Sequence, residues 1–219
     1  MNKYVFVVAA IAVCSAQAKG EQTISTNLPA IQTTLNRPPG GDFWKDEIGS
    51  GFCKGTTELG ASAQYVVGAK IFGTSQTHNL VLGSVRYGKV LSDVVGENTC
   101  WAGNWEVLGE LFGGTQIEPR NTSLVALDGF IRYDFATGTR FIPFFQGGVG
   151  VMYTDIGYPD LGSDFEFNEK AGIGLHYFFT PRFAITVEAR FMHISNAGIS
   201  KHNLGVNTVP VSIGLSYFF

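Results

Sequence analysis

The chain has 219 residues, of which 45% are hydrophobic and 13% aromatic, and it contains 28 glycines. Its formal net charge is −3 at pH 7 and becomes −4 if Lys3 is removed with the N-terminal segment, a balance that argues against a nucleic-acid partner. The composition is typical of a soluble β-sandwich and also of a membrane β-barrel, so the pattern along the chain has to separate these two folds.

Residues 1–18 have the pattern of a secretory signal peptide. Lys3 provides the charged start, an apolar run follows, and Ala16-Gln17-Ala18 is a cleavage site of the A-x-A type. The apolar run is about half of the roughly 20 residues that a membrane-spanning helix needs. We therefore expect an exported chain from which this segment is removed.

The next segment, residues 19–55, is expected to be a loose periplasmic arm. It is largely polar and contains Pro38-Pro39-Gly40-Gly41, which favours irregular structure. The folded part of the chain is therefore expected to begin at about residue 56.

Residues 56–219 contain eight stretches in which apolar and polar residues alternate, separated by residues that favour turns. Alternation with period two indicates β-strands. Eight strands of this length are typical of the smallest common outer-membrane barrel. The sequence therefore predicts an all-β fold, an eight-stranded antiparallel transmembrane β-barrel with an N-terminal extension. The expected strands cover roughly residues 57–72, 78–93, 103–116, 123–135, 140–152, 164–179, 183–195 and 206–219.

The two faces of these strands favour a barrel over a sandwich. In the last strand, Val211 and Ile213 lie on one face and Ser212 lies on the other. Across the strands, the polar face combines glycines with charges of both signs, which can fill a narrow eight-stranded lumen. We therefore expect a plugged interior and not a pore. Phe219 ends an aromatic-rich alternating strand, which resembles the assembly signal of outer-membrane barrels.

An even number of strands puts both chain termini on the periplasmic side. The connections near residues 153–163 and 196–205 are then extracellular. Cys53 and Cys100, the cysteines that follow the signal peptide, both fall on the periplasmic side. Two cysteines in an exported chain tend to pair, so we expect a disulfide that ties the arm to the barrel rim. The alternative is that both thiols stay reduced.

The most informative stretch is His193-Ile194-Ser195, at the end of the seventh expected strand. Residues two apart share one face of a strand, and these two are in phase with the apolar Val187 and Phe191. They should therefore project from the outer wall at the level of the outer leaflet. Polar groups at membrane depth are costly and are usually functional. An imidazole beside a hydroxyl indicates an ester hydrolase that takes its substrate from the membrane; contact with lipid headgroups is the alternative.

Residues 189–219 contain the motif His-x-Ser-Asn-Ala-Gly, which begins at His193 and is followed by Asn203, Gly205 and Asn207. This stretch resembles the PagL-type lipid A 3-O-deacylases and the wider family of acyloxyacyl hydrolases. The resemblance implies a Gram-negative outer-membrane barrel that removes the ester-linked acyl chain from the 3-position of lipid A. It also implies that the active site lies toward the outer leaflet.

The same resemblance implies a role for each motif residue. His193 would be the general base and Ser195 the nucleophile, and these residues require no metal or other cofactor. Asn203, Asn196 and the backbone near Gly198 would stabilise the oxyanion. The implied partners are lipid A or lipopolysaccharide, as the substrate, and the lipids of the outer membrane; homodimerisation is left open.

One position departs from the family. Its characterised members have a glutamate as the third catalytic residue, where this chain has Asn207. A carboxylate orients the imidazole and stabilises its charged form, whereas an amide only orients it. Outer-membrane phospholipase A is similar in this respect, because it places His, Ser and Asn on the outside of a larger barrel.

Strand register supplies a second candidate for this role. If Phe179 pairs with Phe183 across the intervening turn, Glu169 lies opposite His193 on the neighbouring strand. Either Glu169 or Asn207 is therefore expected to support the imidazole; the alternative for Glu169 is a rim charge that meets headgroups. Three functions stay open: a lipid A deacylase, a phospholipase A and a barrel without catalytic activity.

Overall fold

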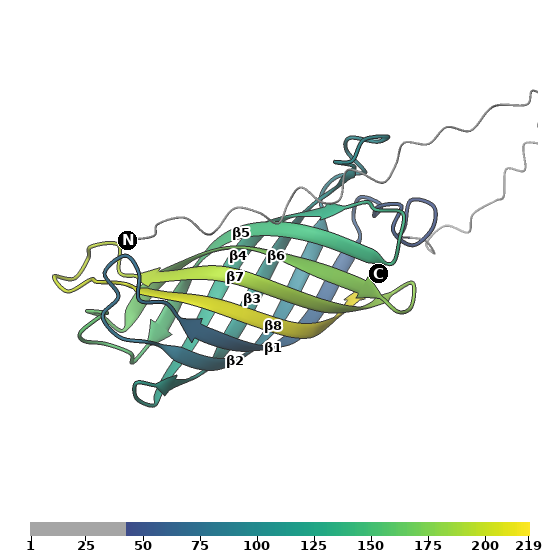
Figure 1. The fold of residues 1–219 in the computed structure, drawn as a ribbon. Coiled ribbons are helices and arrows are strands. Elements are labelled where there is room, and N and C mark those ends of the chain that lie inside the picture. The colour runs from purple at the N-terminus through teal and green to yellow at the C-terminus, as the bar shows by residue number, and fades with distance from the viewer. Residues whose placement is uncertain (1–42) are drawn as a thin grey trace, which may run out of the picture. The chain divides into compact units, whose positions relative to one another are not determined.

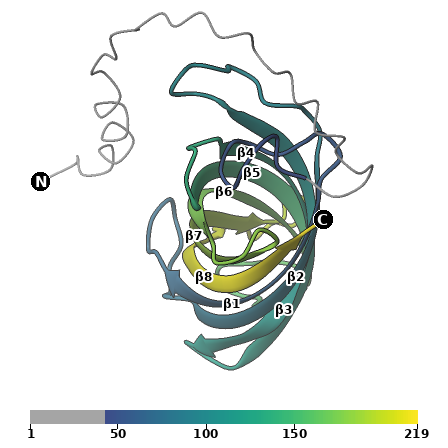
Figure 2. The same cartoon turned by 90° about the vertical axis from the view of Figure 1, so that its right-hand side faces the viewer.

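The computed structural model describes residues 43–219. The expected signal peptide and residues 19–42 of the expected arm lie outside the described residues. Residues 57–218 form an antiparallel barrel, which closes because β1 pairs with β8 (Figure 1, Figure 2). The predicted fold class is confirmed. The strands are β1 (Thr57–Gly68), β2 (Asn79–Val90), β3 (Gly103–Glu118), β4 (Thr122–Phe135), β5 (Phe141–Thr154), β6 (Phe165–Phe178), β7 (Phe183–Ser195) and β8 (Val206–Phe218).

The first strand is shorter than the alternation predicts. It ends at Gly68 and not near residue 72, because the chain turns away from the sheet there. Phe72 and Gly73 both have a positive φ, of 48° and 101°, which is incompatible with a strand. Within residues 43–219, no helix is long and apolar enough to cross a membrane.

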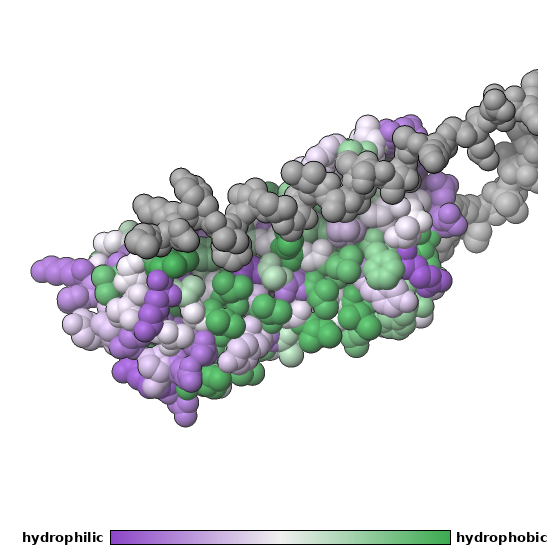
Figure 3. All heavy atoms as spheres, viewed as in Figure 1, coloured by the Kyte–Doolittle hydropathy of each residue, from purple (hydrophilic) through white to green (hydrophobic). Residues whose placement is uncertain are grey.

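The outer wall of the barrel is apolar and its interior is polar. In β8, Val211 and Ile213 are exposed on the outside, while Ser212 is buried inside. Hydrophobic residues cover much of the middle of the wall, and hydrophilic residues gather toward its ends (Figure 3). This is the pattern of a barrel whose wall faces lipid.

Buried ion pairs fill the lumen. Arg86 Nη2 lies 2.9 Å from Glu110 Oε2, and Arg190 Nη1 lies 2.8 Å from Glu110 Oε1. On another side of the lumen, Arg132 Nη1 lies 2.7 Å from Glu58 Oε2. Burying a charge is costly unless an opposite charge and hydrogen bonds compensate for the lost water. These pairs agree with the plugged interior that the polar strand faces predict.

The connections between strands alternate between the two ends of the barrel. We call the end formed by residues 69–78, 119–121, 155–164 and 196–205 the outer end. The opposite end, which carries the C-terminus (Figure 1), is called the inner end.

Residues 43–55 fold against the inner end. Trp44 and Phe52 form an isolated β-bridge, and their stacked rings have centroids 4.5 Å apart. Phe52 also stacks on Phe218 at 5.1 Å, and Trp44 lies edge-on to Phe178 at 4.8 Å. The prediction of a loose arm is wrong for this segment, because its aromatic rings bury apolar surface at the end of the barrel.

Cys53 and Cys100 are not joined by a disulfide in the described part of the chain. The backbone N–H of Cys53 donates to the backbone carbonyl of Phe43 at 2.7 Å, which fixes Cys53 within the segment at the inner end. Cys100 is exposed in the connection between β2 and β3. A disulfide requires close α-carbons and facing β-carbons, and a shared side of the membrane does not provide these. The expected pairing is corrected accordingly.

Candidate active site

Strand β7 places His193 and Ser195 on the outer wall at the outer end of the barrel. Met192 and Ile194, which alternate with them, are fully buried in the interior. His193 and Ser195 themselves are half-buried on the opposite face of the strand. The alternation of apolar and polar residues is thus enough to place the pair outside the lumen.

Strand β8 supplies the hydrogen-bond partner of the histidine. His193 and Asn207 are directly paired across the β7–β8 ladder. His193 Nδ1 lies 2.8 Å from Asn207 Oδ1, and the Asn207 side chain is buried. This contact leaves Nε2, the other ring nitrogen, available on the side away from Asn207.

Glu169 lies on the other flank of His193. The backbone N–H of Phe179 donates to Phe183 at 3.1 Å, and Glu169 pairs with His193 across the β6–β7 ladder, so the predicted register is confirmed. The Glu169 side chain is exposed, and within residues 43–219 it makes no hydrogen bond to His193. Of the two residues expected to support the imidazole, the structure brings Asn207 into contact with it.

Gly205 packs against the imidazole ring of His193. Its φ is +78°, a left-handed conformation that glycine adopts without strain. A β-carbon built at this position would lie 2.7 Å from His193 Cε1. Glycine is therefore required here both for the backbone conformation and for the room that the imidazole occupies.

The residues expected to stabilise the oxyanion differ in whether their N–H groups already make hydrogen bonds within the protein. Asn196 Nδ2 donates to the His202 carbonyl at 3.1 Å, and the Gly198 N–H donates to Asn196 Oδ1 at 3.0 Å. These two donors hold the 196–205 connection together, which does not favour them as oxyanion donors. Asn203 accepts the Asn196 N–H at its Oδ1, at 3.2 Å, so its Nδ2 is the amide donor left for a ligand.

The Ser195 hydroxyl makes no hydrogen bond to any residue from 43 to 219. Its neighbour across the β6–β7 ladder is Phe167, an apolar residue. Ser195 and His193, the expected nucleophile and the expected base, therefore lie on one face of β7 without a hydrogen bond between them. Catalytic hydrogen bonds are often long or absent without substrate and tighten when it binds.

One connection distant in sequence, between β1 and β2, holds the Asn207 amide. Asn207 Nδ2 donates to the Ile71 carbonyl at 2.9 Å and to Thr74 Oγ1 at 2.7 Å. The Thr74 hydroxyl donates in turn to the Gly205 carbonyl at 2.9 Å. Neither Ile71 nor Thr74 is predicted from the sequence, because a threonine in a turn-rich stretch carries no signal of such a contact.

Asp160, between β5 and β6, anchors the same region. Its carboxylate accepts hydrogen bonds from Ser75 Oγ at 2.6 Å and from the backbone N–H of Ser75 at 2.8 Å and of Gln76 at 3.1 Å. His78 Nε2 lies 2.7 Å from the same carboxylate. Burial alone would raise the pKa of Asp160, but the hydrogen bonds from Ser75, His78 and Gln76 hold this pKa below its ordinary value.

In the part of the chain that the structure describes, no group of three or more His, Cys, Asp and Glu side chains could hold a metal ion. The arrangement that is present, a hydroxyl beside a histidine that is oriented by an amide, is suited to nucleophilic attack on an ester.

Solved structures with a similar fold include an outer-membrane enzyme and a surface protein. The crystal structure of the outer membrane enzyme PagL aligns with a TM-score of 0.52 and 20% identity, over 70% of this chain and 97% of that chain. Neisserial surface protein A aligns with a TM-score of 0.54 and 17% identity, over 76% of this chain and 100% of that one. At these identities the likeness establishes the fold.

Sequence similarity is more specific. The lipid A deacylase PagL of Pseudomonas aeruginosa is 34% identical over 79 residues, which make up 35% of this chain and 43% of that protein. The matched part thus spans less than half of this relative. A family model described as lipid A 3-O-deacylase (PagL) matches residues 101–216, more than half of the chain. The residues that carry this match include β7, β8 and the connection between them, so the protein belongs to the lipid A 3-O-deacylase (PagL) family.

Proposed function

We propose that this protein is an outer-membrane esterase that removes the 3-O-linked acyl chain from lipid A through an acyl-serine intermediate. It lies in the outer membrane of a Gram-negative cell, with its outer end toward the outer leaflet. The observation that carries the proposal is the pair His193 and Ser195 on a lipid-facing wall, with His193 Nδ1 held by Asn207 at 2.8 Å. Membership of the deacylase family supplies the substrate class.

In the acylation step, lipid A diffuses in the outer leaflet until its 3-linked ester lies against β7. His193 Nε2 accepts the proton of the Ser195 hydroxyl while Oγ attacks the ester carbonyl. The tetrahedral intermediate then collapses, the bond to the sugar oxygen breaks, and His193 returns the proton to the departing 3-hydroxyl. Ser195 retains the acyl group.

In the deacylation step, water replaces the alcohol. His193 accepts a proton from the water, the resulting hydroxide attacks the acyl-serine carbonyl, and the free fatty acid leaves. The proton returns to Ser195 Oγ, which restores the starting state. In both steps we expect the Asn203 amide nitrogen to donate to the oxyanion; the Asn203 oxygen already accepts the Asn196 N–H, which leaves the nitrogen as the group that can bind a ligand.

Asn207 orients His193 but adds no negative charge beside the imidazolium that forms in each step. Glu169, across the ladder on β6, is the nearest strand partner of His193 that carries one. We expect Asn207→Ala to lower kcat more than Glu169→Ala, because only Asn207 is hydrogen-bonded to the ring. Equal activity of both variants and the wild type would exclude a supporting role for either residue.

A phospholipase A is the second candidate, because its reaction uses the same acyl chemistry and an amide beside the histidine suits it equally well. Mass spectrometry of lipids from a Gram-negative host that expresses the chain separates the candidates. Loss of one 3-linked acyl chain from lipid A supports the proposal, and accumulation of lysophospholipid supports the alternative.

The matched control for this experiment is Ser195→Ala. We expect it to reduce acyl release by at least about 10³-fold, because no other hydroxyl takes the place of the nucleophile. Unchanged lipids in cells that carry the folded wild-type barrel would indicate a non-catalytic membrane protein and would overturn the proposal.

A further inference from the structure

We propose that Thr74 is a positioning residue for the acyl-transfer reaction: it fixes the orientation of the Asn207 amide and, through it, the ring nitrogen of His193 that carries the proton. This inference rests on the proposed function for its catalytic consequence. Its structural part concerns hydrogen-bond polarity alone and is testable separately. Thr74 lies in the connection between β1 and β2, at the outer end of the barrel (Figure 1).

The orientation of the Asn207 amide follows from its partners. The Ile71 carbonyl can only accept, so the group that lies 2.9 Å from it must be the amide nitrogen. The opposite orientation would place two oxygens against each other in a buried position. Asn207 Oδ1 therefore faces His193 Nδ1.

Thr74 reinforces this orientation because its hydrogen-bonding capacity is fully used. Its hydroxyl donates its single proton to the Gly205 carbonyl at 2.9 Å. It accepts from the backbone N–H of Asn207 at 3.1 Å and from Asn207 Nδ2 at 2.7 Å. A hydroxyl has one proton and two lone pairs, so no alternative arrangement satisfies all three partners.

The consequence for the histidine is a defined tautomer. Asn207 Oδ1 can only accept, so the neutral imidazole carries its proton on Nδ1. The lone pair is then on Nε2, the nitrogen that the reaction needs as the base toward Ser195. If the amide turned over, its nitrogen would donate to Nδ1, and the proton would move to Nε2, where it blocks the base.

Thr74 is itself held by a third connection. The next residue, Ser75, donates to the Asp160 carboxylate from both its backbone N–H and its hydroxyl. The Asp160 carbonyl accepts the Gly205 N–H at 3.0 Å. Thr74 and Gly205 are thus tied to one residue of the connection between β5 and β6, which leaves the amide little freedom to turn.

The test compares Thr74→Val with Thr74→Ser. Valine has the shape of threonine without the hydroxyl, whereas serine keeps the hydroxyl. We expect Thr74→Val to lower kcat by about 10- to 100-fold with KM within about twofold of the wild type, as misorientation of a catalytic group would. Thr74→Ser should restore most of the activity.

Thr154→Val is the matched control. Thr154 is also a buried threonine at the outer end, but its hydroxyl donates to the Ser123 carbonyl at 3.1 Å and accepts the Ile156 N–H at 3.3 Å, away from the site. Thr154→Val should lose these buried hydrogen bonds without a change in kcat. The difference in electrophoretic mobility between heated and unheated samples reports whether each barrel is folded.

The decisive measurement is ¹⁵N NMR of the His193 ring in detergent micelles at alkaline pH. The wild type should carry its ring proton on Nδ1, and Thr74→Val should show an increased share of the Nε2-protonated tautomer. A wild-type proton on Nε2 would overturn the inference even if no variant folds. So would a folded Thr74→Val that keeps both the wild-type tautomer and the wild-type kcat.

The two proposals fail in different ways. If the wild type releases no 3-linked acyl chain but the tautomer shifts in Thr74→Val, the positioning role stands and the proposed function fails. If the wild type is an active deacylase and Thr74→Val changes neither quantity, the proposed function stands and the positioning role fails.

Discussion

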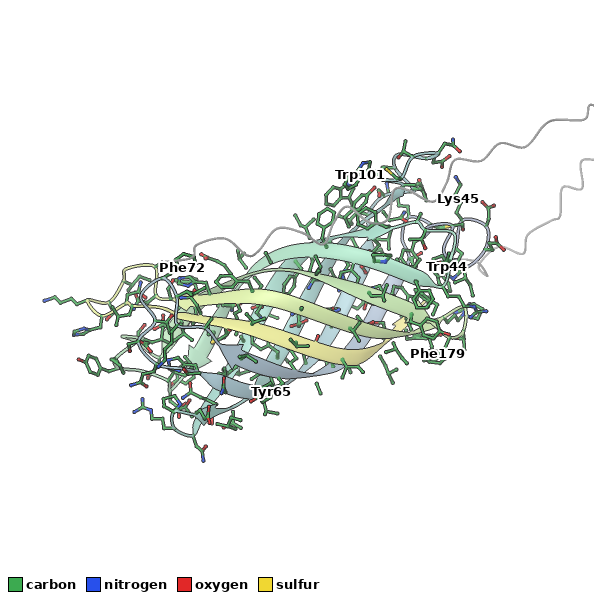
Figure 4. All side chains as sticks on the ribbon, in the orientation of Figure 1. Trp44, Lys45, Tyr65, Phe72, Trp101 and Phe179 are labelled. Atoms are coloured by element: carbon green, nitrogen blue, oxygen red, sulfur yellow. The ribbon has the colours of Figure 1, made fainter. Side chains whose placement is uncertain are left out.

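The two ends of the barrel are closed by different interactions. At the inner end, the rings of Trp44, Phe52, Phe178 and Phe218 pack on one another, with centroids from 4.5 to 5.1 Å apart for the four closest contacts. At the outer end, hydrogen bonds among residues 69–78, 155–164 and 193–207 surround His193. Figure 4 labels Trp44 near the first end and Phe72 near the second.

Because of this difference, the inner end is expected to contribute mainly to the stability of the barrel, and the outer end mainly to the orientation of the site residues. Apolar burial is non-directional, so the inner end can contribute free energy of folding without fixing any single angle. Hydrogen bonds weaken steeply when their angle or distance is wrong, so the outer end fixes the orientation of an imidazole. We therefore expect changes at the inner end to affect unfolding and changes at the outer end to affect turnover.

The largest expected effect is on stability, from Trp44→Ala. The indole is buried, and its Nε1 donates to the Pro181 carbonyl at 2.9 Å. Its removal should lower the free energy of unfolding by about 3 kcal/mol or more. Urea unfolding in micelles, followed by circular dichroism, measures this change.

The control for this variant is Trp101→Ala, because Trp101 is 64% exposed and should cost little. The folded fraction of Trp44→Ala should keep wild-type acyl release. A fall in kcat at full folding would show that the two ends are coupled and would contradict the comparison.

The second-largest effect is expected for Gly205→Ala, which should lower the activity. The added methyl group strains a backbone with φ of +78° and meets His193 Cε1 at 2.7 Å. Displacement of the imidazole should lower kcat by about 100-fold, whereas the strain should cost only about 1 kcal/mol of stability.

Gly138→Ala separates these two causes. Gly138 also has a positive φ, of +68°, but a β-carbon there would meet no atom within 4 Å. It should lose similar stability and no activity. If both variants lost activity equally, backbone strain and not contact with His193 would be the cause.

A smaller effect is expected from Asn207→Asp, although it introduces a negative charge beside His193. One carboxylate oxygen would face the Ile71 carbonyl in place of the amide nitrogen. A buried, unsatisfied acceptor costs about 1–3 kcal/mol, so we expect a fall in kcat of about tenfold and not a gain.

Asn104→Asp is the matched change at the inner end. Asn104 Nδ2 also donates to two carbonyls, those of Phe52 at 2.9 Å and Ser92 at 3.0 Å. It should lower stability and leave kcat unchanged. A higher kcat for Asn207→Asp would mean that the missing charge matters more than the hydrogen bonds of the amide.

The smallest effect is an acid transition confined to the outer end. The pKa of Asp160 is lowered in the folded protein from its ordinary value of 3.8. The ionised carboxylate therefore contributes fully to stability above pH 3.8. This contribution is lost as the pH falls through the lower, folded pKa. The amide NMR signals of Ser75 and Gln76 should shift at acid pH, below the ordinary Asp pKa of 3.8, and not at neutral pH.

Asp160→Asn should abolish this transition, because an amide does not titrate in this range. The signal of the Trp44 indole N–H at the inner end should not follow it. A transition of the Trp44 indole N–H signal with the same midpoint would indicate that the whole barrel unfolds in acid and that the change is not local.

The approximate positions of the strands, the faces on which their residues lie and the β6 neighbour of His193 were predictable from the sequence. Alternation with period two is a local property, and it put His193 and Ser195 outside while Met192 and Ile194 went inside. The tight turn between Phe179 and Phe183 fixed the register that brings Glu169 opposite His193.

The residue that is hydrogen-bonded to the imidazole, and the contacts that hold that residue, were not predictable from the sequence alone. Thr74 and Asn207 are 133 residues apart, and they meet because closure of the barrel brings β1 beside β8. The same holds at the inner end, where Trp44 reaches Phe178 and where Cys53 and Cys100 do not join. Strand pattern is encoded in neighbouring residues, whereas side-chain contacts between distant connections depend on backbone positions that exist only after the sheet has closed.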